Sequence, residues 1–156
     1  MSRIGIISDT HDNLDKVRAA VALFNRRDVE RVVHCGDVVA QFVLAAMSSL
    51  AAPLTIVYGN CDGDRQSLAQ RAREFGFAIG DGPLALEVGG KRIVATHQPI
   101  EPPACDYYFH GHTHKPRHEP GNPTIINPGE ACGWVYGRST VALLDTADGA
   151  VEFVDL

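Results

Sequence analysis

The first half of the chain alternates short apolar runs with amphipathic stretches. Three β-rich runs occupy Arg3–Ser8, Arg31–His34 and Leu54–Val57. Runs of this kind are typical of strands that are buried in parallel sheets. Helical patterns lie between them, so the first half predicts alternating strands and helices.

Three amphipathic patterns predict the helices. The first follows the capping-type residues Asp12 and Asn13, the second ends before Pro53, and the third follows Asp64. Their apolar positions recur at helical spacing: Leu14, Val17, Val21 and Phe24; Phe42, Ala46, Met47 and Leu50; and Leu68, Ala72 and Phe75.

From Phe77 onward the pattern changes to strands alone. Turn residues separate the strands, at Gly89-Gly90, Gly121-Asn122-Pro123 and Asp148-Gly149. The whole pattern predicts an α/β protein with a two-sheet core flanked by helices. We see no repeat or linker, so we expect residues 1–156 to form a single domain. The expected strands are Leu84–Val88, Arg92–Thr96, Tyr107–Phe109, Thr124–Ile126, Thr140–Leu144 and Ala150–Val154.

Composition narrows the class of protein. Hydrophobic residues make up 45% of the chain, which supports the core of one compact enzyme, and the net charge is −5. Arginines are interspersed with acids, so we expect no nucleic acid polymer as a partner. No stretch resembles a signal peptide or approaches the roughly 20 apolar residues of a membrane span. The four cysteines form no C-x-x-C pair, so we expect a cytoplasmic protein with reduced thiols and no membrane partner.

Candidate metal ligands gather in five short segments, and each segment follows an apolar run. Open α/β sheets bind their ligands at the carboxyl ends of the strands, so we expect the segments to converge. A spacing of two in Asp9-x-His11 and His112-x-His114 places both side chains on one side of an extended backbone. The segments are Asp9-Thr10-His11, Gly36-Asp37, Gly59-Asn60-Cys61-Asp62, Thr96-His97 and Gly111-His112-Thr113-His114.

The ligand types indicate which ions would bind. Asp37 has two carboxylate oxygens and can bridge two ions, and Asn60 offers a neutral carbonyl oxygen. The candidate histidines supply imidazole nitrogen, which suits Mn, Fe, Co, Ni or Zn better than Mg or Ca. Mixed nitrogen and oxygen ligation does not choose among those metals. Glycines precede several of these residues, where a missing Cβ would let the backbone approach the site closely.

The five segments, in this order, resemble the calcineurin-like metallophosphoesterase superfamily. The Gly-Asn-Cys-Asp form and the small size are similar to its bacterial and archaeal single-domain phosphodiesterases, and the likeness extends to the turn at Asn127-Pro128-Gly129. This resemblance implies two mixed β-sheets packed in a sandwich and flanked by helices, an αββα arrangement. It also implies a binuclear site, in which Asp9, His11, Asp37 and His114 hold one metal and Asp37, Asn60, His97 and His112 hold the other.

The resemblance further implies a metal-dependent phosphodiesterase that hydrolyses small phosphodiesters by attack of a metal-bridging hydroxide. The cofactors would be two divalent transition-metal ions, with manganese preferred and nickel, cobalt, iron or zinc as alternatives. The alternative function is a noncatalytic interaction scaffold, because a retromer subunit uses a similar fold as a binding module. Retention of every ligand favours the enzyme, and the acidic charge balance disfavours an endonuclease. The expected catalytic residues are Asp37, Asn60, Cys61 and Asp62.

Two features depart from the superfamily pattern. Cys61 stands where a histidine usually helps to protonate the leaving group, so we expect weak acid catalysis there. The 13 residues between His97 and Gly111 include three prolines, where many relatives carry a longer connection with a helix. We therefore expect a helix-free loop and a more open site.

Other residues keep more than one interpretation. Cys61 is either a small buried hydrophobe or part of the pocket lining, and Asp62 could orient its neighbours or cap a turn. Arg65 would contact the substrate phosphate or be solvated at a helix start, and His34 is expected to support the site or pack rather than bind metal. We expect Glu130, Cys132 and Trp134 to be turn and packing residues, and His110 and His118 to be ordinary strand residues.

Overall fold

The computed structural model describes residues 2–156, which form two β-sheets and three helices. The first half contains β1 (Arg3–Ile7), α1 (Leu14–Arg26), β2 (Arg31–His34), α2 (Phe42–Ala46), β3 (Leu54–Val57), α3 (Arg65–Phe75) and β4 (Ala78–Gly80). The second half contains β5 (Leu84–Val88), β6 (Lys91–Ala95), β7 (Tyr107–Phe109), β8 (Pro116–Glu119), β9 (Thr124–Pro128), β10 (Thr140–Asp145) and β11 (Val151–Asp155).

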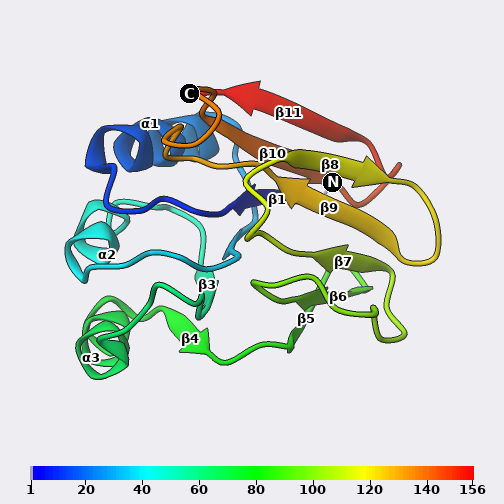
Figure 1. Ribbon diagram of the computed structural model, residues 1–156. Coiled ribbons are helices and arrows are strands. Elements are labelled where there is room, and N and C mark those ends of the chain that lie inside the picture. The colour runs from blue at the N-terminus through cyan, green and yellow to red at the C-terminus, as the bar shows by residue number, and fades with distance from the viewer. Residues whose placement is uncertain (1) are drawn as a thin grey trace.

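The larger sheet has six strands in the order β11-β10-β1-β2-β3-β4. Strands β1 to β4 run parallel, whereas β10 is antiparallel to both β1 and β11. The helices connect the parallel strands and cover one face of this sheet (Figure 1). The longest of them, α1, has 13 residues, and no helix within residues 2–156 is long and apolar enough to cross a membrane.

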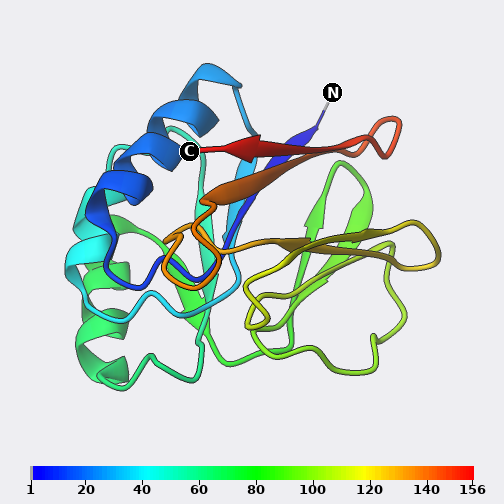
Figure 2. The same ribbon diagram turned by 45° about the horizontal axis from the view of Figure 1, so that its top comes forward.

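The smaller sheet has five strands in the order β5-β6-β7-β9-β8. Its central strands β6, β7 and β9 are parallel, and its edge strands β5 and β8 are antiparallel to their neighbours. Figure 2 shows this sheet on the side of the larger sheet that faces away from the helices. The expected α/β fold of two mixed sheets with flanking helices is confirmed, and the helices α1 to α3 all cover the larger sheet.

Two apolar clusters hold these layers together. One lies between the helices and the larger sheet and includes Val17, Phe24 and Ile7. The other lies between the two sheets and includes Ile6 from β1 and Phe109 from β7. Full burial of such a side chain contributes roughly 1.5–3 kcal/mol. Burial of Ile6 and Ile7 on opposite faces of β1 makes that strand the shared centre of both clusters.

The structure corrects parts of the predicted pattern. The helix expected around Phe42, Ala46, Met47 and Leu50 is only Phe42–Ala46, and Phe42 is 63% exposed instead of lying on a buried face. Met47 is buried as expected, but Val43 and Leu44 take the place of Phe42 on the buried face, because so short a helix does not sustain the expected periodicity. Strand β4 was missed, and β8 was expected only as a strand residue at His118, without bounds. They are short edge strands of three and four residues with largely exposed or half-buried side chains, so they lack a clear apolar alternation.

Candidate metal centre

The five predicted segments meet where the carboxyl ends of strands from both sheets come together. Asp9, Asp37 and Asn60 lie beyond β1, β2 and β3, whereas His97 and His112 lie beyond β6 and β7. Backbone hydrogen bonds join the loops within each sheet, from Asp9 N–H to Gly36 O at 3.0 Å and from Gly111 N–H to His97 O at 3.0 Å. Across the sheets, Ala131 N–H donates to Ser8 O at 3.0 Å. The predicted ligands therefore come from loops at the edges of two separate sheets, and backbone hydrogen bonds join these loops.

The backbone of this centre is strained. The φ angles are positive at Asp9 (53°), His11 (37°), Asp37 (61°), His112 (68°) and His114 (64°). Residues other than glycine rarely adopt such angles, which cost about 1–3 kcal/mol each and persist where the surrounding structure dictates them. This concentration of strain coincides with the predicted ligands and is typical of a functional site.

Close approach of the loops requires glycine at two positions. A Cβ atom at Gly59 would overlap the Asp37 carboxylate, and one at Gly111 would lie 2.7 Å from Asp9 Oδ2. Any side chain at either position would push a carboxylate out of the centre. These glycines therefore let the loops close around Asp9 and Asp37.

One set of donor atoms consists of Asp9, His11, Asp37 and His114, whose ligand atoms all lie within 4.8 Å of one another. His11 Nε2 lies 3.6 Å from Asp9 Oδ1 and 3.4 Å from Asp37 Oδ2. His114 Nε2 lies 3.2 Å from Asp9 Oδ1. This is the set that the sequence predicted for the first metal.

A second set consists of Asp37, Asn60, His97 and His112. His97 Nε2 lies 2.8 Å from Asn60 Oδ1 and 3.2 Å from Asp37 Oδ2. His112 Nδ1 lies 3.1 Å from Asn60 Oδ1 and 3.3 Å from His97 Nε2. Asp37 Oδ2 contacts histidines of both sets, which is the position expected of a bridging carboxylate.

The two sets fit divalent cations on several grounds. Ligands that share one tetrahedral ion at about 2.0–2.2 Å lie roughly 3.3–3.6 Å apart. The separations are 3.2–3.6 Å in the first set, close to this range, and slightly shorter, 2.8–3.3 Å, in the second. Asp9 Oδ1 and His11 Nε2 are buried and accept or donate no hydrogen bond within the described residues. Buried polar atoms are normally satisfied, so these two call for a partner such as a cation.

Charge within the cluster supports the same interpretation. The neighbouring Asp37 and Asp9 carboxylates raise the pKa of His11 to about 10. Burial raises the pKa of Asp37, but its close contacts with the His11 and His97 rings and the hydrogen bond from the Cys61 backbone N–H outweigh burial and hold that pKa below its usual range. In the metal-free protein the carboxylates are thus ionised and balanced by protonated imidazole, and a bound cation would displace those protons.

His34 is fully buried behind the cluster and cannot contact a substrate. Its Nδ1 accepts from Gly36 N–H at 3.1 Å, so its Nε2 carries the proton toward Thr10 Oγ1 at 3.0 Å. The Thr10 hydroxyl in turn reaches the Asp37 carbonyl at 3.4 Å. Burial lowers the pKa of His34 to about 4, which keeps it neutral in this chain of hydrogen bonds. The network links the loops that carry Asp9 and Asp37.

Asp62 is buried, and both of its oxygens accept hydrogen bonds from the backbone. Oδ2 accepts from Asp37 N–H at 3.0 Å and from Gly59 N–H at 2.7 Å, and Oδ1 accepts from Val39 N–H at 2.7 Å. Its carboxylate therefore fixes the loops that present Asp37 and Asn60. The catalytic role that the sequence predicted for Asp62 stays a prediction.

Cys61 is exposed at the mouth of the centre, so of its two interpretations the small buried hydrophobe is wrong, and a role in lining the substrate site stays a prediction. Its backbone N–H donates to Asp37 Oδ1 at 2.9 Å, and its Sγ accepts from Asn60 Nδ2 at 3.5 Å. Partial burial and the nearby Asp37 raise the pKa of the thiol, so it remains protonated near neutral pH. Cys61 thus offers the centre a weak acid rather than a thiolate.

Glu130 was expected to be a turn and packing residue, and its contact with a predicted metal ligand was not anticipated. Glu130 is 1% exposed, and its Oε2 lies 2.7 Å from His114 Nδ1. Its oxygens also accept from the backbone N–H groups of Val135 and Tyr136 at 2.7–3.2 Å. Carboxylates commonly hold the far nitrogen of metal-binding histidines in this way. The sequence offered only an acid directly after the Asn127-Pro128-Gly129 turn, and its burial is seen in the structure alone.

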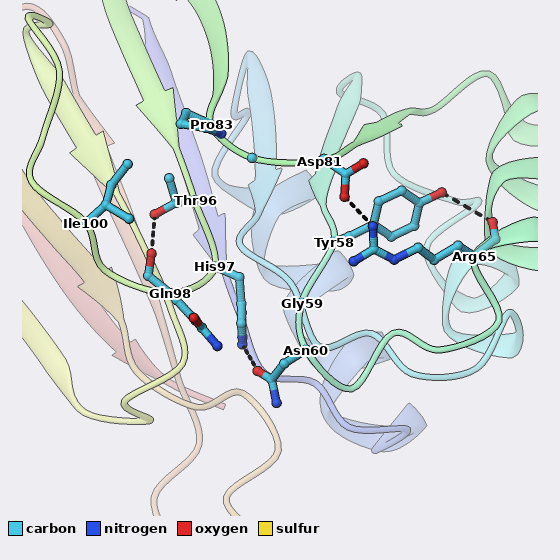
Figure 3. Close-up of a pocket in the computed structure, with 11 residues that line it drawn as sticks. Tyr58, Gly59, Asn60, Arg65, Asp81, Pro83, Thr96, His97, Gln98 and Ile100 are labelled. Carbon is cyan, nitrogen blue, oxygen red and sulfur yellow. Dashed lines mark hydrogen bonds and ion pairs between the residues drawn. The ribbon is translucent and has the colours of Figure 1, made fainter.

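Trp134 and Arg65 lie on either side of the donor sets. Trp134 was expected to pack, but it is 63% exposed, and its Nε1–H donates to His11 O at 3.1 Å. Arg65 belongs to neither donor set. It forms an ion pair with Asp81 near Asn60 and His97 (Figure 3).

Comparison with known proteins agrees with this geometry. Residues 2–149 match the calcineurin-like phosphoesterase superfamily domain. The phosphodiesterase MJ0936 of Methanocaldococcus jannaschii is 36% identical over 154 residues, which cover 92% of this chain and 93% of that protein. The solved structure of an archaeal phosphodiesterase superposes with a TM-score of 0.92 at 34% identity and covers 99% of each chain.

More distant structures share only the fold. Vps29 of Chaetomium thermophilum has a TM-score of 0.72 at 16% identity and covers 100% of this chain and 96% of its own. The family match spans nearly the whole sequence and is supported by a relative that is more than one-third identical. This chain therefore belongs to the calcineurin-like phosphoesterase superfamily.

Proposed function

We propose that the protein is a phosphodiesterase with a binuclear metal centre that hydrolyses small phosphodiesters. The observation that carries this proposal is the convergence of all seven predicted ligands into two donor sets that share Asp37. The phosphodiesterase relative of similar length supports the reaction class. Manganese is our first choice of ion, with nickel, cobalt, iron and zinc as alternatives that the same mixture of ligands would accept.

When bound, two divalent ions would supply an activated water as nucleophile and neutralise the charge that develops on the phosphate. The chain itself positions these ions. Asp37 holds both sets at a fixed separation, while the backbone N–H of Cys61 orients its Oδ1 at 2.9 Å. Glu130 and the Cys35 carbonyl orient the rings of His114 and His97 at 2.7 and 2.8 Å. Asn60 presents its amide at the open side of the centre.

The retromer-type scaffold remains the alternative class. Its support is the fold likeness to Vps29 at 16% identity, which carries no functional information about this chain. A scaffold has no need for strained ligand loops or for buried, unsatisfied polar atoms. Their presence at Asp9 and His11 favours the enzyme.

Substitution of the shared carboxylate tests the proposal. Asp37→Asn keeps the shape of the side chain but removes the charge common to both sets. We expect the bound metal, measured by elemental analysis, to fall below two ions per chain. Hydrolysis of bis(p-nitrophenyl) phosphate should drop by at least about a hundredfold, because several kcal/mol of transition-state stabilisation are lost.

The matched control is Asp15→Asn, since the Asp15 side chain is 96% exposed on α1. It should keep both the metal content and the activity. Undiminished hydrolysis by Asp37→Asn, or by chelator-treated native protein, would falsify the proposed mechanism.

A further inference from the structure

A hollow of about 300 Å³ lies directly beside the second donor set. We call it the arm pocket, and it is lined by Tyr58, Arg65, Asp81, Pro83, Gln98 and Ile100, with Asn60 and His97 at its inner end. Figure 3 shows Tyr58, Arg65 and Asp81 on one wall and Gln98 and Ile100 on the other. Since Asn60 and His97 belong to both sites, a phosphate at the metal centre would direct one of its ester groups into this pocket.

The charged residues of the arm pocket neutralise each other. Arg65 forms an ion pair with Asp81, and its guanidinium carbon lies 4.6 Å from the centre of the Tyr58 ring. The Tyr58 hydroxyl donates to the Arg65 carbonyl at 3.3 Å. Among the described residues that line the pocket, Arg65 is the one Lys or Arg. A second anionic group would therefore meet no unpaired cation there, and its desolvation would oppose binding.

The opposite wall is formed by Gln98 and Ile100, and hydrogen bonds hold its backbone in place. Ile100 is 46% exposed, yet its backbone N–H donates to the Tyr108 hydroxyl at 3.0 Å. The Thr96 hydroxyl donates to the Gln98 carbonyl at 2.8 Å. These bonds hold the loop after β6 without using the Gln98 amide or the Ile100 side chain. An apolar surface and a free amide thus face the Arg65–Asp81 pair across the pocket.

We propose that the arm pocket binds one ester arm of the phosphodiester substrate and selects an uncharged aromatic ring. This inference rests on the proposed function. The ring would pack its face on Ile100 and Pro83, and its edge would meet the polar groups of Gln98, Arg65 and Asp81. The volume is at the lower end of ligand pockets, which suits one ring-sized group rather than a large ligand.

Calorimetric titration of the manganese-loaded protein tests the pocket without catalysis. Phenylphosphonate and methylphosphonate carry the same phosphonate charge and differ in the arm alone. We expect the phenyl compound to bind about tenfold more tightly, and Ile100→Ala to reduce this ratio by about three- to tenfold. Phe42→Ala is the control, because Phe42 is 63% exposed and lies outside the pocket, and it should leave the ratio unchanged.

A charged ring tests the role of the ion pair. We expect 4-carboxyphenylphosphonate to bind the native protein more weakly than phenylphosphonate. Asp81→Asn leaves Arg65 unpaired and should reverse that order. In methyl-detected NMR of the zinc-loaded protein, which is diamagnetic, the Ile100 signal should shift with phenylphosphonate and stay in place with methylphosphonate.

The outcomes separate this inference from the proposed function. Equal binding of the phenyl and methyl compounds to the native protein, with both inhibiting diester hydrolysis, overturns the arm pocket alone. An unchanged ratio in Ile100→Ala overturns it as well. Absence of binding by both compounds, together with chelator-insensitive hydrolysis, overturns the proposed function and the arm pocket with it.

Discussion

Glu130 Oε2 lies 2.7 Å from Nδ1 of His114, whose opposite ring nitrogen faces Asp9. Burial raises the pKa of Glu130, but the contact with His114 and the hydrogen bonds from backbone amides outweigh burial. The pKa is therefore lowered overall, and the carboxylate stays ionised. Glu130 therefore orients the ring of His114 and strengthens its free nitrogen as a ligand.

We expect Glu130→Gln to lower metal affinity by about 10–100-fold, the usual cost of losing such a supporting carboxylate. The amide keeps an oxygen for the backbone N–H groups, so the fold should survive, and circular dichroism checks this. Metal titration by calorimetry measures the loss. Glu152→Gln serves as the control, since Glu152 is exposed on β11 and pairs with Arg27. Native affinity in Glu130→Gln would show that Glu130 has only a packing role.

The charge of the centre predicts a preference for diesters over monoesters. Two divalent ions with the carboxylates of Asp9 and Asp37 and one hydroxide would give the donor sets a net charge of about +1. A diester monoanion matches this charge, whereas a monoester dianion needs a further cation, and Arg65 is already paired with Asp81. We expect kcat/KM for bis(p-nitrophenyl) phosphate to exceed that for p-nitrophenyl phosphate by roughly tenfold or more. A clear advantage for the monoester would sink the idea.

The weak acidity of the Cys61 thiol leads to a prediction about which leaving groups depart well. A positioned acid contributes about 10²–10⁴-fold when its pKa lies near the working pH, and the raised pKa of this thiol makes it a poor acid. We expect Cys61→His to improve alkyl leaving groups selectively. The Asp62 oxygens already accept three backbone hydrogen bonds, so the new histidine would lack a carboxylate partner. The gain in rate should therefore lie toward the lower end of the range of about 10²–10⁴-fold. A plot of log rate against leaving-group pKa should be shallower for the variant, and equal slopes would exclude a protonation role.

The burial of His34 leads us to expect that the free energy of unfolding decreases in acid. Its pKa is lowered to about 4 by burial, so the folded protein keeps it neutral while the unfolded chain binds a proton below about pH 6.5. Its contribution to stability is therefore fully present above pH 6.5 and is lost as the pH falls toward 4. We expect His34→Gln, which can keep both hydrogen bonds, to flatten the decline in the free energy of unfolding over this range. Denaturant titrations of both metal-free proteins at pH 7 and pH 4.5 measure it, and parallel declines would contradict the assignment.

The sequence by itself determined the strand ends and the candidate ligands. Asp9, Asp37, Asn60 and His97 each follow a strand whose apolar run is legible locally, and the carboxyl ends of parallel strands share one edge. Those rules were enough to predict that the ligands converge and to anticipate two mixed sheets from the resemblance. They failed at α2, where Phe42 is exposed, and at the three-residue edge strand β4, where no apolar alternation marks the strand.

Tertiary structure alone decided how residues from different loops support the centre. His114 and Glu130 are joined because the loops after β7 and β9 leave neighbouring strands, and Asp62 meets the amides of Asp37 and Val39 across two loops. The arm pocket combines Arg65 from α3 with Ile100 from the loop after β6. The first two contacts join loops of neighbouring strands within one sheet, whereas the arm pocket depends on how the two sheets are placed on each other. Side-chain periodicity reports which face of an element is buried and carries no information about which distant loop will lie opposite it.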